Sequence, residues 1–288
     1  MAARRTSFFV AILILALPTV RLAAEDTAPR DHRALLDESL GFSVNKLGLQ
    51  NVLDLRWTWP LTASKSPLLA DAHLSVGATH YITPSYTRLG VWLEVSPLSI
   101  LDLRAGAEPG AYFGTFGSLM SFDSYGQPFD DDARDARKQE ARSGTGSCLY
   151  LSPTLKLKLG PVVASSSADF EWWRSSAAGP LYYEPARDTL LKVGGDRLLT
   201  TSTVLLRRHE LRGRGTLSYG LGHNLSYVFA APDNRSQRIG VLAVRQFGER
   251  RFGLHTPRIA GHVSYYLSDP SRKGQISAAL GVSLSLAR

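Results

Sequence analysis

The sequence predicts an all-β fold, an antiparallel up-and-down transmembrane β-barrel of about 12 strands (roughly 10–12). Three observations predict it: apolar and polar residues alternate along most of the chain, the alternating segments are long, and short connections take turns with long ones. Hydrophobic residues make up 44% of the 288 residues, yet they do not form several runs of about 20, which excludes a polytopic helical membrane protein.

The alternation of polarity is the main evidence for strands. Successive side chains of a strand point to opposite faces, so a strand between lipid and an aqueous lumen alternates apolar with polar residues. Such segments here have about 9–14 residues, enough to cross a bilayer when tilted, whereas strands in soluble proteins average about 5–6. The pattern covers 51–61, 71–79, 88–95, 101–108, 149–159, 216–227, 258–267 and 276–286, and it is weaker in 162–173, 197–206 and 238–247.

The strand count and the connections complete this prediction. About eleven segments alternate, but bacterial single-chain barrels have even strand numbers. A further strand within 41–50 would give twelve, and failure of 51–60 to span would leave ten. Short turns are expected on the periplasmic side and long loops outside. Short connections are predicted at 96–97, 160–161 and 248–251, and long ones at 109–147, 174–196, 230–237 and 268–274.

The N-terminal region has the features of an export signal. Arg4 and Arg5 precede an apolar run over 8–17, and Ala23-Ala24 supplies small residues for cleavage. These features are typical of a cleaved secretory signal peptide over 1–24. Residues 25–40 are charged and predict a periplasmic leader, with a short helix over 33–40. The barrel itself is then expected over 41–288.

Aromatic and charged residues extend the barrel prediction. Aromatic rings near strand ends are expected to form two girdles at the lipid headgroups. They are Trp57, Trp59, Tyr81, Tyr86, Trp172, Trp173, Tyr227, Phe229, Tyr265 and Tyr266. Charge is unfavourable against lipid, so charged positions should face the lumen, where they either line a narrow pore or pair and plug it. The expected lumen-lining residues are Asp54, Arg56, Asp71, His73, Arg88, Glu94, Asp102, Arg104, Glu108, Lys156, Lys158, Arg258 and His262.

With this pattern the chain resembles the monomeric, porin-like outer-membrane β-barrel proteins of Gram-negative bacteria, over about residues 41–288. The resemblance implies a location in the outer membrane, contact with its lipid and lipopolysaccharide, and handling by the barrel-insertion machinery. It also implies a non-enzymatic role as a narrow pore for small solutes or as a structural surface component. The chain departs from the family at Leu284–Arg288, where many members end in an aromatic residue.

Two His-x-Ser pairs carry the alternative of an enzyme. His73 and Ser75, like His262 and Ser264, would share one face of a strand, so an imidazole could activate a hydroxyl. Outer-membrane phospholipases and lipid A deacylases resemble this arrangement, but the residue that would orient the histidine is not evident. We therefore expect no catalytic residues and no cofactor. Scattered basic residues, despite a net charge of +8, also argue against binding to nucleic acid.

The loop 121–147 is rich in charges of both signs. Its acids could hold Ca²⁺, which prefers six to eight oxygen ligands, but the spacing of an EF-hand is missing. A self-paired, solvated segment is the expected reading, with a Ca²⁺ or lipopolysaccharide-bridging site and a folded-in pore constriction as alternatives. The candidate Ca²⁺ ligands are Asp123, Asp130, Asp131, Asp132 and Asp135.

Overall fold

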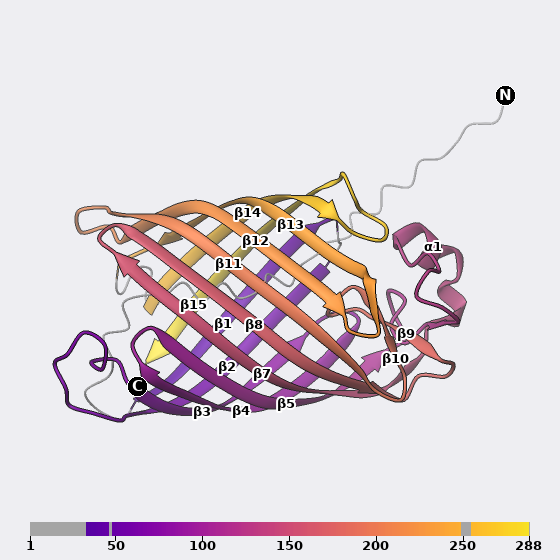
Figure 1. Ribbon diagram of the computed structural model, residues 1–288, viewed down its shortest axis with the longest axis horizontal. Helices are drawn as coiled ribbons and strands as arrows, with labels where there is room; N and C mark the ends of the chain where they lie inside the picture. The colour runs from indigo at the N-terminus through magenta and orange to yellow at the C-terminus, as the bar shows by residue number, and fades with distance from the viewer. Residues whose placement is uncertain (1–32, 46–47, 249–254, 288) are drawn as a thin grey trace.

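The computed structural model describes residues 33–45, 48–248 and 255–287, so the predicted signal peptide lies outside the described residues. Twelve antiparallel strands form a closed barrel in which nearly every strand pairs with its neighbours in sequence (Figure 1). The predicted fold class and the count of twelve are therefore confirmed. The barrel strands are β1 Arg33–Val44, β2 Gly48–Pro60, β3 His73–Ile82, β4 Tyr86–Leu98, β5 Leu101–Phe113, β7 Ser143–Leu159, β8 Val162–Ser175, β11 Asp196–Glu210, β12 Thr216–Val228, β13 Ala231–Gln246, β14 His255–Ser268 and β15 Ile276–Ala287.

The first and last strands close the barrel. β1 pairs with β15 in a register that places Gly41 opposite Gly281, and it pairs with β2 on its other side. The predicted leader with a helix over 33–40 is thus wrong from Arg33 onward, because these residues belong to β1. A strand bonded on both sides leaves no exposed edge, which a barrel in lipid requires.

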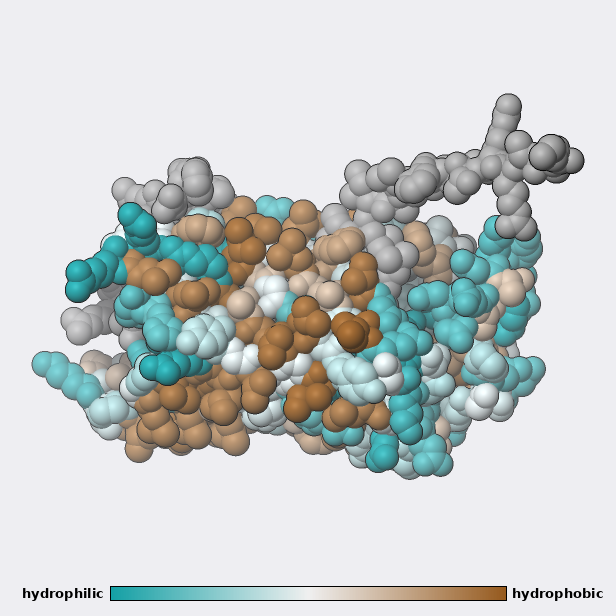
Figure 2. Space-filling model, turned by 90° about the horizontal axis from the view of Figure 1, so that it is seen from above, coloured by the Kyte–Doolittle hydropathy of each residue, from teal (hydrophilic) through white to brown (hydrophobic). Residues whose placement is uncertain are grey.

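The outer surface of the barrel is apolar. Large hydrophobic side chains on it are exposed, among them Val91 at 59%, Leu149 at 56% and Leu155 at 55%. The polar residues between them are buried, as Arg88 and Glu94 on β4 illustrate. Figure 2 shows hydrophobic residues across the middle of the barrel and hydrophilic residues gathered at both ends. The alternation therefore sorts apolar residues outward and polar residues inward.

The two ends of the barrel differ. Leu35 pairs with Ala287, so β1 begins and β15 finishes at one end, which we call the terminal end. The connections 61–72, 99–100, 160–161 and 211–215 lie there as well. The other end carries 114–142 and 176–195, somewhat shorter than the predicted 109–147 and 174–196 because the flanking strands continue further. The long loop predicted at 230–237 is wrong, since β13 already begins at Ala231.

The two long connections fold together over one end of the barrel. They contribute β6 (Ser121–Phe122), β9 (Leu181–Glu184) and β10 (Thr189–Lys192), which form a three-stranded sheet in the order β10-β9-β6. A short helix α1 (Asp131–Ala136) and a 3-10 turn η1 (Lys138–Glu140) lie beside it (Figure 1). We call residues 114–142 and 176–195 the lid, and this end of the barrel the lid end.

Only some of the predicted girdle aromatics face outward. Trp57, Trp172 and Tyr265 are exposed at 48%, 44% and 46%. Trp173 and Tyr86, in contrast, are buried and pack beneath the lid. The alternation explains this split, because Trp172 and Trp173 are adjacent on β8 and must point to opposite faces.

Among the helices that the structure describes, none is long and apolar enough to cross a membrane.

Candidate functional site

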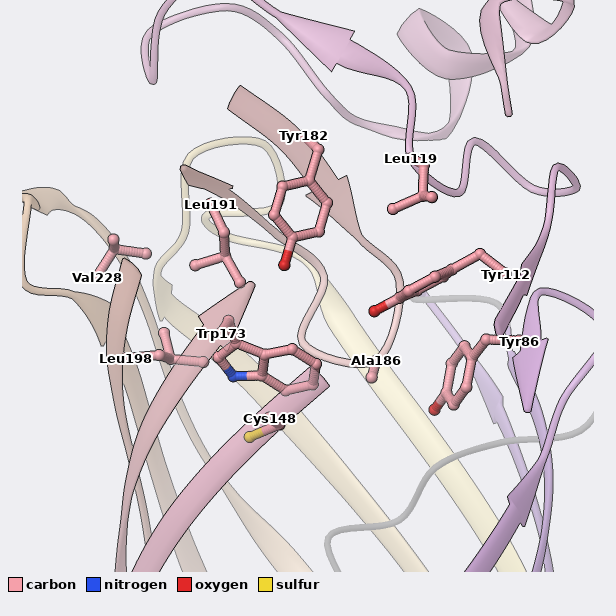
Figure 3. Packing of buried hydrophobic residues seen from close by; sticks show 10 residues of the cluster. All are labelled: Tyr86, Tyr112, Leu119, Cys148, Trp173, Tyr182, Ala186, Leu191, Leu198 and Val228. Carbon is pink, nitrogen blue, oxygen red and sulfur yellow. The ribbon is translucent and has the colours of Figure 1, made fainter. Parts of the chain in front are cut away.

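The lid inserts the tip of the β9–β10 hairpin into the lid end of the barrel. Tyr182, Ala186 and Leu191 come from this hairpin, and each is at least nine-tenths buried. Figure 3 shows them pointing toward Trp173 of β8 and Tyr112 of β5. The shared hydrophobic cluster joins lid and barrel wall, so the lid is packed into the mouth instead of lying loosely above it. Its members are Tyr86, Tyr112, Leu119, Cys148, Trp173, Tyr182, Ala186, Leu191, Leu198 and Val228.

An ion pair joins the hairpin tip to the barrel wall. Arg187 donates from Nε to Oε2 of Glu171 at 2.9 Å and from Nη2 to Oε1 at 2.5 Å. The Trp173 indole nitrogen donates to the same carboxylate at 2.6 Å. The Glu171 side chain is 1% exposed, and that of Arg187 is 32% exposed. A bidentate arginine on a buried carboxylate is among the stronger polar contacts in proteins, so it fixes the tip to β8.

A second carboxylate of the lid is fully buried. Glu184 accepts hydrogen bonds from the Tyr112 hydroxyl and from the Ala186 backbone N–H, the latter at 3.0 Å. Burial raises the pKa of Glu184 above its ordinary value, although nearby Arg88 and the Tyr112 hydrogen bond oppose this rise. Arg88 lies 4.9 Å from the Tyr86 ring centroid, and its Nη1 is 3.4 Å from Oε2 of Glu108. Charges and aromatic rings therefore fill the mouth together.

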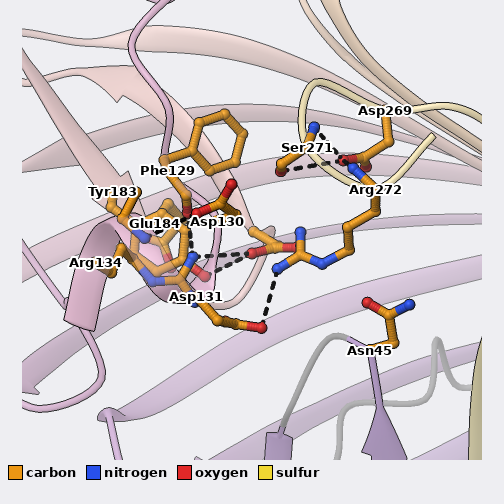
Figure 4. Close-up of polar contacts among 12 residues, drawn as sticks. Asn45, Phe129, Asp130, Asp131, Arg134, Tyr183, Glu184, Asp269, Ser271 and Arg272 are labelled. Carbon is orange, nitrogen blue, oxygen red and sulfur yellow. Dashed lines mark hydrogen bonds and ion pairs between the residues drawn. The ribbon is translucent and has the colours of Figure 1, made fainter. Parts of the chain in front are cut away.

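Asp188 joins three loops at the lid end, its own and those that carry Arg272 and Arg134. Arg272, in the β14–β15 connection, donates from Nη1 to Oδ2 of Asp188 at 2.5 Å. The Tyr183 hydroxyl donates to Oδ1 of Asp188 at 2.6 Å, and Nη1 of Arg134 lies 3.7 Å from Oδ1. Arg272 is 2% exposed. Figure 4 shows Arg134 and Arg272 on opposite sides of Asp131, which contacts both of them. We call Asp188, Arg272 and Arg134 the latch, because together they join both parts of the lid to the β14–β15 connection.

Many of the charged residues predicted for the lumen are engaged with one another across neighbouring strands. Arg104 donates from Nε to Oε2 of Glu94 at 2.9 Å, and Nζ of Lys156 lies 2.8 Å from Oδ2 of Asp102. These four side chains therefore form ion pairs between neighbouring strands. Three more of the predicted lumen residues have partners: Arg56 pairs with Asp37 at 3.1 Å, Asp54 accepts a hydrogen bond from Thr79 at 3.1 Å, and Arg88 pairs with Glu108. Three others lie near the terminal end: Asp71 in the connection before β3, Lys158 exposed on β7, and Arg258 on β14.

The structure brings together one of the two predicted His-x-Ser pairs. Nε2 of His262 lies 3.2 Å from Oγ of Ser264. His73 instead contacts Ser96 on the next strand, with 3.2 Å between Nε2 and Oγ. Ser75 has its hydroxyl 2.8 Å from that of Thr58 and is fully buried. A cross-strand partner is closer than the residue two positions along the strand, which explains why the predicted His73–Ser75 contact does not form.

The acids of loop 121–147 are used within the lid. Asp130 caps α1, since its carboxylate accepts a hydrogen bond from the Ala133 N–H at 2.8 Å. Asp131 pairs with Arg134, and its Oδ2 lies 3.7 Å from Nη2 of Arg272. Asp123, Asp132 and Asp135 join no cluster: within 33–45, 48–248 and 255–287, no group of three or more His, Cys, Asp or Glu could hold a metal ion. The candidate Ca²⁺ ligands are therefore dispersed.

Sequence reasoning identified neither the latch nor the contact of Arg187 with Glu171. The signal available was the run Leu181-Tyr182-Tyr183-Glu184, which does not alternate in polarity. All four side chains are buried, so both faces of β9 contact protein. A strand covered by protein on both faces does not alternate apolar with polar residues, so its sequence did not predict a folded lid.

Comparisons with known proteins find likeness in fold only. No protein-family model matches the sequence, and no curated protein matches it either. Among solved structures, the NanC porin aligns with a TM-score of 0.41 and 8% identity, covering 87% of this chain and 98% of its own. The β domain of the Bordetella autotransporter BrkA aligns with a TM-score of 0.43 and 16% identity, covering 88% and 98%. The KdgM porin in complex with disordered oligogalacturonate gives 0.39 and 10%, covering 88% and 99%. Similarity of this degree transfers no ligand or activity.

Proposed function

We propose that this protein is a non-enzymatic narrow pore of the Gram-negative outer membrane, held closed at its outer mouth by its own lid. The apolar outer surface favours a place among acyl chains, because a closed barrel satisfies its backbone hydrogen bonds internally. The lid end carries the two longest connections and faces outward, and the terminal end faces the periplasm, because outer-membrane barrels place their longer loops outside. Residues 1–24 would direct export and then be cleaved.

The observation that carries the closed state is the contact of Arg187 with Glu171. It places a loop arginine on a buried carboxylate of the barrel wall, at 2.5 and 2.9 Å, next to Ala186 and Trp173 of the hydrophobic cluster that joins lid and wall. Large aqueous channels arise in barrels of about 16–18 strands, so a 12-strand barrel leaves a narrow lumen that one inserted hairpin can block. The solutes that would pass are small.

Planar-bilayer conductance tests the proposal. The wild-type protein should show rare, brief openings, and Arg187→Ala should increase the open fraction several-fold because the hairpin tip loses its attachment to Glu171. Arg142→Ala is the matched control, since Arg142 is also a lid arginine but is exposed and donates to the backbone carbonyl of nearby Gln139 at 3.0 Å. If neither the wild type nor Arg187→Ala conducts, the barrel is a structural component and not a pore.

A further inference from the structure

A groove runs across the outer surface of the barrel from β12 to β1. It has a volume of about 680 Å³ and is almost entirely apolar. Its floor includes the small residues Ala243, Gly261 and Ala278, which point outward between larger neighbours. A Cβ atom added at Gly261 would have only ordinary contacts, at 3.7 and 3.8 Å, so the space above it is open. The groove is therefore a hollow bordered by protruding aliphatic side chains such as Val241 and Leu280.

Basic side chains lie where the groove approaches the terminal end. The groove begins at Tyr219, which pairs with Arg207 of β11 and with Ala243 of β13. Arg245 lies two residues beyond Ala243 on the same outward face of β13. His209 stacks on Tyr219 with 5.5 Å between ring centroids. Two guanidinium groups thus flank the end of an apolar hollow, beside an aromatic pair at the border of the apolar band.

The charge around this end of the groove is strongly positive. The β11–β12 connection adds the exposed Arg212 and Arg214. Glu210 is the one acid between Arg207 and Thr216, and it pairs with Arg208 at 2.9 Å. Arg245 uses its guanidinium to hold the backbone carbonyls of Thr216 and Arg214, at 3.2 and 2.5 Å, and keeps its positive charge. Among the residues that the structure describes near this end, an anionic group would find several cations and little competing negative charge.

We propose that this groove binds one anionic phospholipid of the periplasmic leaflet. The phosphate would lie between Arg207 and Arg245, and one acyl chain would lie over Ala243, Gly261 and Ala278. Apolar volume and positive charge are separate observations, and a phospholipid with net negative charge is the molecule whose two parts fit both. Each arginine near a membrane surface contributes about fivefold to the affinity for anionic lipid. The proposal requires the barrel to lie in a membrane but does not depend on whether it conducts.

Native mass spectrometry of the detergent-refolded full chain tests this proposal. The protein is released from micelles that contain equal amounts of phosphatidylglycerol and phosphatidylcholine with identical acyl chains. We expect one phosphatidylglycerol to be retained, with a preference of about tenfold or more over phosphatidylcholine. Arg207→Gln and Arg245→Gln should each reduce that preference about fivefold. Arg207→Lys, which keeps the charge, should reduce it less.

Matched controls separate the headgroup contact from the groove. Arg197→Gln changes another outward arginine of β11, at the lid end, and should leave retention unchanged. Gly261→Leu fills the groove and should lower retention of both lipids, whereas Ala105→Leu, outward on β5, should not. Equal retention of the two lipids by the wild type would overturn the proposal. So would full competition by glycerol phosphate, because a site for phosphate alone needs no groove.

Discussion

Arg187 and Glu171 form a bidentate ion pair although one belongs to the β9–β10 hairpin of the lid and the other to a barrel strand. The pair is asymmetric, because Glu171 is buried while about a third of the Arg187 side chain is exposed. Most of the electrostatic consequence of breaking it therefore falls on the carboxylate. Glu171 would be left in the wall with Trp173 as its one remaining hydrogen-bond donor among the contacts described above.

Arg187→Ala is therefore expected to destabilise the folded protein. Removing one partner of a buried ion pair leaves an uncompensated charge, and the loss should be about 3 kcal/mol, at the lower end of the usual range because Arg187 is partly exposed. Equilibrium unfolding in urea from detergent micelles measures this loss. The double variant Arg187→Ala/Glu171→Gln should recover part of it. No recovery would mean that the contact contributes through packing and not through charge.

The latch should protect the lid from proteolysis. Asp188→Asn weakens the contacts with Arg272, Tyr183 and Arg134 together, so cleavage within residues 176–195 should become several-fold faster. Limited proteolysis with mapping of the cut sites measures this rate. Asp135→Asn serves as the control, because Asp135 is a lid acid outside the latch. Equal cleavage rates in the two variants would contradict the role of Asp188.

Lid stability should fall as pH rises. Burial raises the pKa of Glu184, so the folded lid binds this proton more tightly than the unfolded lid does. The resulting stabilisation is complete below the ordinary pKa, near 4.5, and is lost as pH rises through the raised value. Between pH 5 and 8, hydrogen exchange in β9 should therefore become faster than its chemical pH dependence alone predicts. Glu184→Gln should remove this excess, and an unchanged excess in that variant would assign it to another group.

Two glycines on the barrel should respond to different extents to the same substitution. A Cβ at Gly77 would lie 2.3 Å from the Trp92 ring and 2.5 Å from the Leu55 carbonyl oxygen, whereas a Cβ at Gly261 would make only ordinary contacts, at 3.7 and 3.8 Å. Gly77→Ala should lower the unfolding free energy by about 1–3 kcal/mol, because neither the ring nor the backbone can give way easily. Gly261→Ala should change it by less than about 0.5 kcal/mol. The same urea titration compares them, and equal effects would be evidence against the inward packing of Trp92.

The barrel could be predicted from sequence because its strands are long and each face meets a different medium. The twelfth strand was predicted within 41–50, whereas β1 begins at Arg33. The charges of Asp37 and Glu38 resemble those of a solvated leader, although Asp37 faces inward to Arg56. Lid structure was harder to predict for another reason. Its contacts join residues distant in sequence, as in Arg272 with Asp188, which are 84 residues apart. The polarity pattern of a short segment does not predict contacts between residues this far apart.

Fluorescence quenching by brominated acyl chains tests the central claim, that the leucine-bearing face meets lipid and the opposite face points into the barrel. In a Cys148→Ala background, single cysteines at Leu151 and Ser152 would carry the same fluorophore on adjacent residues of β7. The probe at position 151 should be strongly quenched by brominated lipid, and the probe at position 152 only weakly. Equal quenching at both positions, or stronger quenching at 152, would contradict the account.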